Sequence, residues 1–213
     1  MAGVTSHSAA ERAALAAALT DAGPDAPTLC EGWTARDLAA HLVVRERRID
    51  SMPGILVPPL AGWTERVRRG YARRPYDDLV AAVRNGPART SWAALPRIDA
   101  LVNLGEHFVH CEDVRRGAPG WTPRQLPPQR QEALWRIVST RGRLFFRKSP
   151  VGVTLADPGG RTARVLDKEP TVVVRGEPAE LVLFAFGRTG HALVDLDGAD
   201  DAVARLTAAE LGV

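Results

Sequence analysis

Apolar residues recur at helical spacing through most of the first 145 residues of the chain. Leu15, Ala16 and Leu19, for example, fall on one face of a helix. Gly- and Pro-rich stretches separate the helical segments, and the Pro-rich connector at residues 51–63 cannot continue a helix. The pattern predicts helices over residues 6–22, 34–49, 62–73, 76–84, 96–116 and 127–142.

The pattern changes after about Ser149. The runs "VGVTLAD", "TARVLD", "PTVVVRG" and "HALVDLDG" are β-branched or alternate between apolar and polar residues, which is typical of strands. Two short helical segments, "EPAELVLFAFG" and "ADDAVARLTAAEL", are interspersed with them. We therefore predict an α+β protein in which a helical domain, residues 1–148, precedes a small mixed α/β domain, residues 149–213.

The second predicted helix has a clear start signal in "TARD". Thr34 can cap the helix, and Asp37, three residues later, fits the acidic partner of a capping box. His41 follows on the same helix. A lone histidine there is ordinarily a hydrogen-bonded core or edge residue, so its meaning depends on what lies opposite.

The composition limits the classes of partner that the protein is expected to bind. The net charge is only +3, and the 26 arginines against 2 lysines form separate clusters interrupted by acids, so we expect no nucleic-acid partner. No apolar run approaches the roughly 18 residues that span a membrane, and the first residues do not resemble a signal peptide. We expect a cytoplasmic monomer or homodimer that does not bind membranes, with Cys30 and Cys111 as reduced thiols.

Candidate chemistry is concentrated in "GEHFVHC", within the helix predicted over residues 96–116. Residues four apart share a helix face, so two ligand pairs compete: Glu106 with His110, and His107 with Cys111. Cys111 also continues an apolar stripe through Leu101, Leu104 and Phe108, which favours a buried small hydrophobic residue there.

The face of Glu106 and His110 also carries Asp99, Asn103 and Asp113. The pattern alone predicts that this face is solvated. In a helix bundle, however, such a stripe can point into a ligand-lined cavity. His41 on another helix would then complete a set of two histidines and one glutamate, which is typical of a catalytic zinc site with an open fourth position.

Two stretches, "LCEGWTARDLAAHLVVRE" and "LGEHFVHCEDVRR", resemble the mycothiol-dependent maleylpyruvate isomerase family of the DinB-like metalloprotein superfamily. The likeness lies in a Trp-x-x-x-Asp-Leu-x-x-His helix followed by a Glu-x-x-x-His-x-x-Asp helix. It implies a DinB-like four-helix bundle that binds one divalent metal ion, usually zinc, through His41, Glu106 and His110. His107 and Cys111 are then not ligands.

The resemblance extends to "VVVRGEPAELVLFAFGR", which is similar to the family's small second domain. Arg188 matches the Gly-Arg of that domain, which implies a catalytic residue facing the site; a solvated arginine at a helix end is the alternative. Asp113 matches the last residue of the metal-helix motif, which implies that it orients a ligand or holds the helix end.

The function that the resemblance implies is a metal-dependent enzyme with mycothiol as thiol cofactor or co-substrate. Such an S-transferase or isomerase transfers the thiol to a small electrophilic substrate or isomerises that substrate. The metal would lower the pKa of the thiol. The alternative is a non-catalytic metal-binding or stress-response protein of the same fold.

Overall fold

The structure is a computed structural model that describes residues 2–48, 61–87 and 100–212. The chain forms two compact units, Met1–Pro123 and Arg124–Val213. Each unit has its own core and is described by itself.

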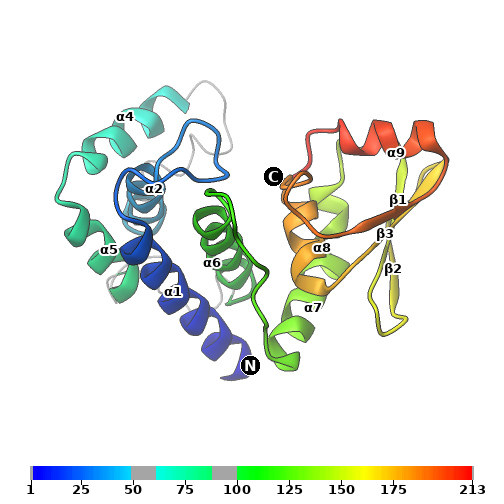
Figure 1. Cartoon of the computed structure of the whole chain (residues 1–213), viewed down its shortest axis with the longest axis horizontal. Coiled ribbons are helices and arrows are strands. Elements are labelled where there is room, and N and C mark those ends of the chain that lie inside the picture. Colours follow the sequence, from blue (N-terminus) through cyan, green and yellow to red (C-terminus); the bar gives the residue numbers. More distant parts are fainter. Residues whose placement is uncertain (1, 49–60, 88–99, 213) are drawn as a thin grey trace. The chain divides into compact units, whose positions relative to one another are not determined.

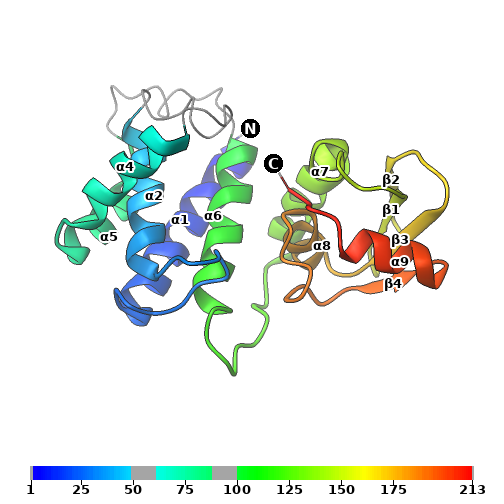
Figure 2. The same cartoon turned by 90° about the horizontal axis from the view of Figure 1, so that it is seen from above.

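The first unit is helical. It contains α1 (Ala2–Ala22), α2 (Ala35–Arg47), α4 (Ala61–Ala72), α5 (Tyr76–Asn85) and α6 (Ala100–Arg115). Figures 1 and 2 show α1 between α5 and α6, and it packs against both, while α2 packs against α4 and α5. The predicted helices are present with ends that differ by a few residues. The predicted start at residue 96 and most of the predicted connector at 51–63 lie outside the described residues.

The core of the first unit is built from the apolar faces of α1, α2, α5 and α6. Cys111 is 1% exposed and belongs to this core, which confirms the prediction that it acts as a small hydrophobic residue. Leu101 was assigned to the same stripe, but its side chain lies outside the described part of the chain. Burial of this face fixes how α6 is rotated about its axis, and therefore where Glu106 and His110 point.

The second unit is a small α/β structure. It contains α7 (Pro128–Phe145), β1 (Gly152–Ala156), β2 (Thr162–Leu166), β3 (Thr171–Arg175), α8 (Pro178–Ala185), β4 (Asp195–Asp197) and α9 (Asp200–Thr207). The strand order is β2-β1-β3-β4, with β1 and β3 parallel and the other two pairs antiparallel. Helix α7 packs against α8 and β2, so it belongs to this unit, whereas the predicted boundary after residue 148 grouped it with the helical domain.

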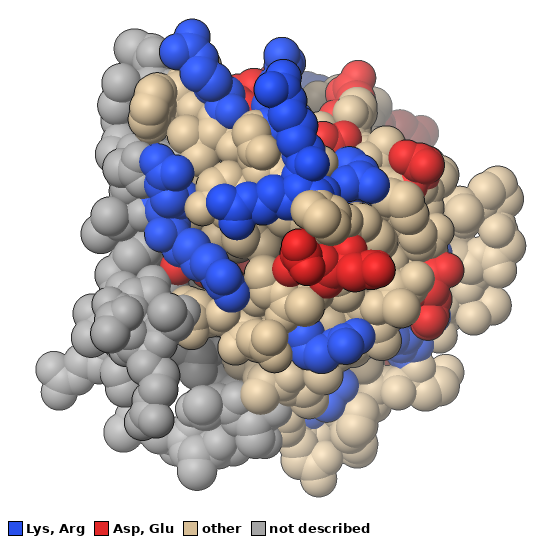
Figure 3. All heavy atoms as spheres, turned by 90° about the vertical axis from the view of Figure 1, so that its left-hand side faces the viewer, with Lys and Arg blue, Asp and Glu red and all other residues tan. Residues whose placement is uncertain are grey.

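Basic and acidic side chains are mixed on the surface of the first unit. Figure 3 shows arginine side chains interleaved with aspartate and glutamate on the face that carries α4 and α5. Part of this mixture is ion pairing, since Glu65 accepts from both Arg68 and Arg69. None of the described helices combines the length and the apolar character that a membrane span requires.

Candidate metal centre

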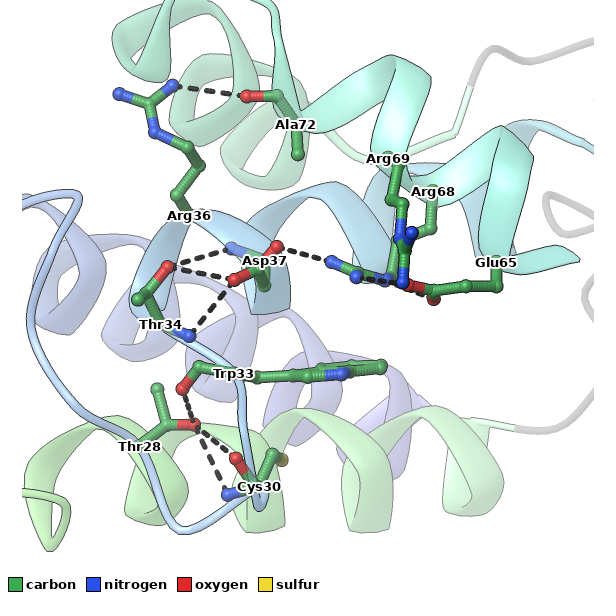
Figure 4. Close-up of polar contacts among 10 residues, drawn as sticks. All are labelled: Thr28, Cys30, Trp33, Thr34, Arg36, Asp37, Glu65, Arg68, Arg69 and Ala72. Carbon is green, nitrogen blue, oxygen red and sulfur yellow. Dashed lines mark hydrogen bonds and ion pairs between the residues drawn. The ribbon is translucent and has the colours of Figure 1, made fainter.

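The start of α2 is fixed by the predicted capping box. Thr34 accepts a hydrogen bond from the Asp37 backbone amide, and the Asp37 carboxylate accepts one from the Thr34 amide at 3.2 Å. Figure 4 shows both contacts. They satisfy amides that the first turn of a helix leaves without partners. The capping box therefore sets the position from which α2 carries His41, two turns further on.

The ring of His41 lies against the indole of Trp33, with ring centroids 5.1 Å apart. The guanidinium of Arg68, from α4, lies over the same indole at 4.8 Å. Arg68 is buried and pairs with Asp37 and Glu65, as Figure 4 shows. Trp33 therefore contacts both the Arg68 cation and the ring of His41.

The environment of His41 keeps its imidazole neutral. Burial is the largest cause and the nearby His110 adds to it, so the pKa of His41 is lowered to about 3. Glu106 opposes this shift but does not outweigh it. A neutral imidazole is the form of histidine that binds a metal ion.

On α6, the polar face points into the protein, so the prediction of a solvated face is wrong and the alternative, an inward-facing polar stripe, is right. Asp113 is fully buried, His110 is 9% exposed and Glu106 is partly buried. The predicted neighbour Asp99 lies outside the described residues. The physical reason is that α6 contacts the protein on more than its apolar stripe, which periodicity alone does not reveal.

His110 connects two carboxylates. Its Nδ1 lies 2.9 Å from Oδ2 of Asp113, and its Nε2 lies 3.5 Å from Oε2 of Glu106. Burial lowers the pKa of His110, but hydrogen bonds with Asp113, Cys30 and Glu106 together raise it well above its ordinary value. Burial raises the pKa of Glu106. The interactions with His110 and Arg45 outweigh burial and lower the pKa of this carboxyl group to about 2.

The structure thus places the His41 ring of α2 beside His110 of α6, which in turn contacts Glu106. The rings of His41 and His110 meet edge to face, with centroids 5.6 Å apart. Two donors bound to one zinc ion at about 2.0–2.1 Å and a tetrahedral angle are roughly 3.3 Å apart. The 3.5 Å between Nε2 of His110 and Oε2 of Glu106 is close to that value.

Among the described residues, one group of potential ligands has all its ligand atoms within 4.8 Å of one another, and it consists of Cys30, His110 and Asp113. His41 and Glu106 do not belong to this group. The thiol of Cys30 donates to Asp113 Oδ2 at 3.2 Å. Cys30 was predicted only as a reduced thiol, without a role in the site. Its position in "LCEGW", the segment directly before the capping box, is the signal for its place here.

The Cys30 loop reaches α6 because Gly117 lets the two backbones approach. A Cβ atom on Gly117 would lie 2.2 Å from the carbonyl oxygen of Pro27. Next along the loop, the Leu29 amide donates to the carbonyl of Asp113 at 3.0 Å. Gly117 directly follows the helix predicted over residues 96–116, and in the structure it seats this loop beside the site.

His107 lies in a different cluster. Its Nε2 is 3.3 Å from Oε1 of Glu46, and its Nδ1 is 3.5 Å from the hydroxyl of Ser8. Glu46 is held in turn by both terminal nitrogens of Arg12. Together with the burial of Cys111, this separates the pair His107 and Cys111 from the predicted ligands.

Arg188 belongs to the second unit, directly after α8. Gly187, at φ +85°, and Arg188 end this helix with backbone bonds to Phe184 and Leu183 in the pattern of a Schellman motif. The guanidinium of Arg188 donates to the carbonyl of Phe186 at 2.7 Å. The Gly-Arg pair therefore has a clear local role in ending α8.

Comparisons with known proteins agree with this architecture. Residues 5–139, more than half of the chain, match the family model described as the mycothiol maleylpyruvate isomerase N-terminal domain.

A crystal structure of the mycothiol-dependent maleylpyruvate isomerase is similar at 19% identity with a TM-score of 0.64. A mutant of that enzyme, with alanine in place of a histidine, is similar at 18% and 0.63. Both comparisons cover 91% of each chain. At these identities the likeness shows the fold, and it confirms the predicted α+β class. No curated protein matches the chain.

Proposed function

Because the chain belongs to the mycothiol maleylpyruvate isomerase N-terminal domain family, we propose that it is a metal- and thiol-dependent enzyme. Its substrates would be a low-molecular-weight thiol such as mycothiol and a small electrophile, which it conjugates or isomerises. The proposed location is the cytoplasm, where Cys30 and Cys111 stay reduced.

The observation that supports this proposal is that Glu106 and His110 lie 3.5 Å apart, with the His41 ring 5.6 Å from the His110 ring. Two imidazoles and one carboxylate are a donor set that suits zinc, and three protein ligands leave a fourth position for an external ligand. Asp113 holds Nδ1 of His110 at 2.9 Å, which leaves Nε2 for the metal. A bound divalent metal would stabilise the thiolate form of the thiol near neutral pH.

The chain's own residues supply orientation and charge. Trp33 and the capped start of α2 fix the ring of His41. The low pKa of Glu106, about 2, keeps that carboxylate ionised for the metal at any physiological pH. Asp113 contacts Nδ1 of His110 and would orient this ligand, which favours the orienting role over that of holding the helix end.

Arg188 remains a proposed catalytic residue, through the positive charge that it would offer to an anionic substrate. Arg188→Ala is expected to lower turnover and leave the metal content unchanged. Unfolding by urea, measured in parallel, separates this effect from a loss of the helix end that Arg188 forms.

One observation favours the second candidate, a metal-binding protein without turnover. Cys30 and Asp113 lie near enough to His110 to add protein ligands and close the site. Against this candidate, the 2.9 Å between His110 and Asp113 is a hydrogen-bond distance, whereas the 3.5 Å between His110 and Glu106 suits two ligands of one ion.

The test of the proposed function is elemental analysis of purified protein together with a thiol-conjugation assay over small electrophiles. About one divalent metal ion per chain is expected, lost in His41→Ala and in His110→Ala. The matched control is His191→Ala, which removes an exposed histidine of the second unit and should retain the metal. Protein that binds neither zinc nor nickel would contradict the proposal. A metal-loaded protein that conjugates no thiol would favour the second candidate.

A further inference from the structure

The second unit contains a pocket of about 770 Å³, and none of its lining residues belongs to the proposed metal site. It lies at the carboxyl ends of β1 and β3, which are parallel, and beside the start of β4. Its lining includes Asp157 and Pro158 after β1, Arg175 and Gly176 at the end of β3, and residues 192–195, which lead into β4. In open α/β sheets, ligands commonly bind outside the carboxyl ends of parallel strands, in pockets of roughly 300–1,000 Å³.

Two carboxylates anchor the walls of this pocket. The Asp157 side chain is 6% exposed and accepts hydrogen bonds from the backbone amide and Nε of Arg161, at 2.8 and 2.6 Å. Glu180, buried in the first turn of α8, accepts a hydrogen bond from the Leu193 amide at 2.9 Å. Gly176 lets this segment approach β3, since a Cβ atom there would lie 3.1 Å from the Leu193 carbonyl oxygen. The pocket is therefore built from anchored segments, as expected of a preformed binding site.

Arg175 and Asp195 present opposite charges side by side at the pocket. They are partners in the antiparallel register of β3 and β4, so their side chains leave the same face of the sheet with Cβ atoms about 4.5–5.5 Å apart. The Arg175 guanidinium nevertheless turns to Asp197, two residues along β4, at 3.4 Å. Among the residues that the structure describes, the Asp195 carboxylate has no hydrogen-bond or ion-pair partner.

The contact between Arg175 and Asp197 is weaker than the other ion pairs of this sheet. Arg161 reaches Asp157, and Arg164 reaches an aspartate, each at 2.6 Å. The side chains of Arg175 and Asp197 are 54% and 68% exposed, and such a surface pair contributes little free energy. A carboxylate on a ligand can therefore replace Asp197 at low cost, and it matches the planar fork of arginine.

The charges and the apolar lining together select a class of ligand. A purely anionic ligand would leave Asp195 without a cation, and a purely cationic one would leave Arg175 to its weak surface pair. A free α-amino acid carries an ammonium group and a carboxylate at short separation, so it complements both. Leu193, 53% exposed, lines the pocket with Pro158, and an apolar side chain on the ligand would remove this surface from water.

We infer that this pocket binds a free α-amino acid with an apolar side chain, its carboxylate at Arg175 and its ammonium group at Asp195. The site lies wholly in the second unit and does not depend on the proposed metal chemistry.

The test is an NMR titration of the isotope-labelled full chain with L-leucine and two analogues. Leucinamide keeps the ammonium group and lacks the carboxylate, whereas N-acetyl-leucine keeps the carboxylate and lacks the ammonium group. L-leucine is expected to shift amide signals of the pocket, such as those of Gly160 and Gly176. Each analogue should bind about tenfold more weakly, because a hydrogen bond to a charged group contributes about 1.5 kcal/mol.

Two substitutions assign the charged groups. Arg175→Gln should weaken the binding of L-leucine about tenfold without weakening that of leucinamide. Asp195→Asn should weaken the binding of L-leucine about tenfold without weakening that of N-acetyl-leucine. The matched control is Arg164→Gln, at an exposed arginine of β2 that pairs with Asp167, and it should bind L-leucine like the unmodified chain.

Several outcomes would overturn the inference. L-leucine that binds equally well after both substitutions, or that shifts signals away from the pocket, would place its site elsewhere. N-acetyl-leucine that binds as tightly as L-leucine would make this a site for anions, and leucinamide that does so would make it a site for cations. The absence of any shift with L-leucine would leave the pocket without this ligand. None of these outcomes affects the proposed function, because the metal is not involved.

Discussion

Helix α6 carries two buried histidines three positions apart, and their surroundings differ in how completely the protein satisfies them. His107 faces Glu46, whose carboxylate is clamped by Arg12 at 2.9 and 2.5 Å. His110 lies between Asp113 at 2.9 Å and Glu106 at 3.5 Å, and Arg45 lies 3.7 Å from Glu106. The groups around His107 are paired with one another, whereas the groups around His110 are potential metal ligands.

The pKa values of these two histidines are therefore shifted in opposite directions, although both residues lie on α6. Burial lowers the pKa of His107, and Glu46 only partly opposes it. The pKa of His110 is raised well above its ordinary value despite burial, because Asp113, Cys30 and Glu106 all favour its charged form. A cluster that attracts a proton this strongly also attracts a metal cation, whereas a saturated cluster contributes mainly to structure.

The largest expected effect is the loss of metal in His110→Ala. Removing a ligand should reduce metal affinity by well over about 100-fold, since even outer partners of a ligand contribute about 10–100-fold. Elemental analysis after dialysis measures it, with the exposed His191→Ala as control. Metal retained at one ion per chain in His110→Ala would place the site elsewhere.

Glu46→Gln should affect stability instead of metal binding. It leaves Arg12, whose side chain is 16% exposed, without its carboxylate, and breaking such a buried pair costs about 3 kcal/mol. Urea unfolding measures the loss, and Glu31→Gln, at an exposed position, is the control. If Glu46→Gln released the metal from folded protein, the two clusters would not be independent.

Asp113→Asn should weaken metal binding by about 10–100-fold while the fold persists, because Asp113 orients His110 through Nδ1. Competition with a metal chelator measures the affinity. Asp78→Asn, at an exposed position on α5, is the control. Equal affinities for the two variants would remove Asp113 from the site.

In metal-free protein, the contributions of His110 and of Glu46 to stability should change with pH in opposite directions. His110 has a raised pKa, so its contribution to stability is complete below its ordinary pKa of 6.5 and is lost as pH rises through the raised value. Glu46 has a lowered pKa, so its contribution is present above 4.5 and is lost as pH falls through the lowered value. Each slope is up to about 1.4 kcal/mol per pH unit.

Unfolding curves recorded across a range of pH measure both changes: the loss of stability at high pH, the alkaline limb, and the loss at low pH, the acid limb. Asp113→Asn should flatten the alkaline limb, and Glu46→Gln should flatten the acid limb. An alkaline limb that persists unchanged in Asp113→Asn would contradict the role given to that carboxylate.

The smallest effect is expected for Cys30→Ser. The thiol is a weak donor to Asp113, so a hydroxyl in its place should change metal affinity by less than about threefold. The same chelator competition measures it. A large loss would instead support the donor set of Cys30, His110 and Asp113.

Local signals in the sequence predicted much of this molecule. Thr34 and Asp37 form the predicted capping box, and Cys111 is buried on the predicted apolar stripe. These predictions succeed because they depend on residues one turn apart. The wrong prediction, a solvated face at Glu106 and His110, depended on what packs against α6, which no local pattern encodes.

Contacts between distant segments were missed for the same reason. Cys30 meets Asp113 only because Gly117 admits the Pro27 loop, a contact across more than 80 residues. Arg68, which comes from another helix, holds the indole beside His41. Arg188 was assigned through a resemblance, and its local role at the end of α8 became clear only from backbone hydrogen bonds.

The most direct test of the central claim is X-ray absorption at the zinc edge of zinc-loaded protein without added thiol. Binding by His41, Glu106 and His110 predicts nitrogen and oxygen scatterers at about 2.0–2.1 Å, with the imidazole pattern of two histidines and no sulfur. A sulfur scatterer at about 2.3 Å would contradict the claim, because it would identify Cys30 as a ligand.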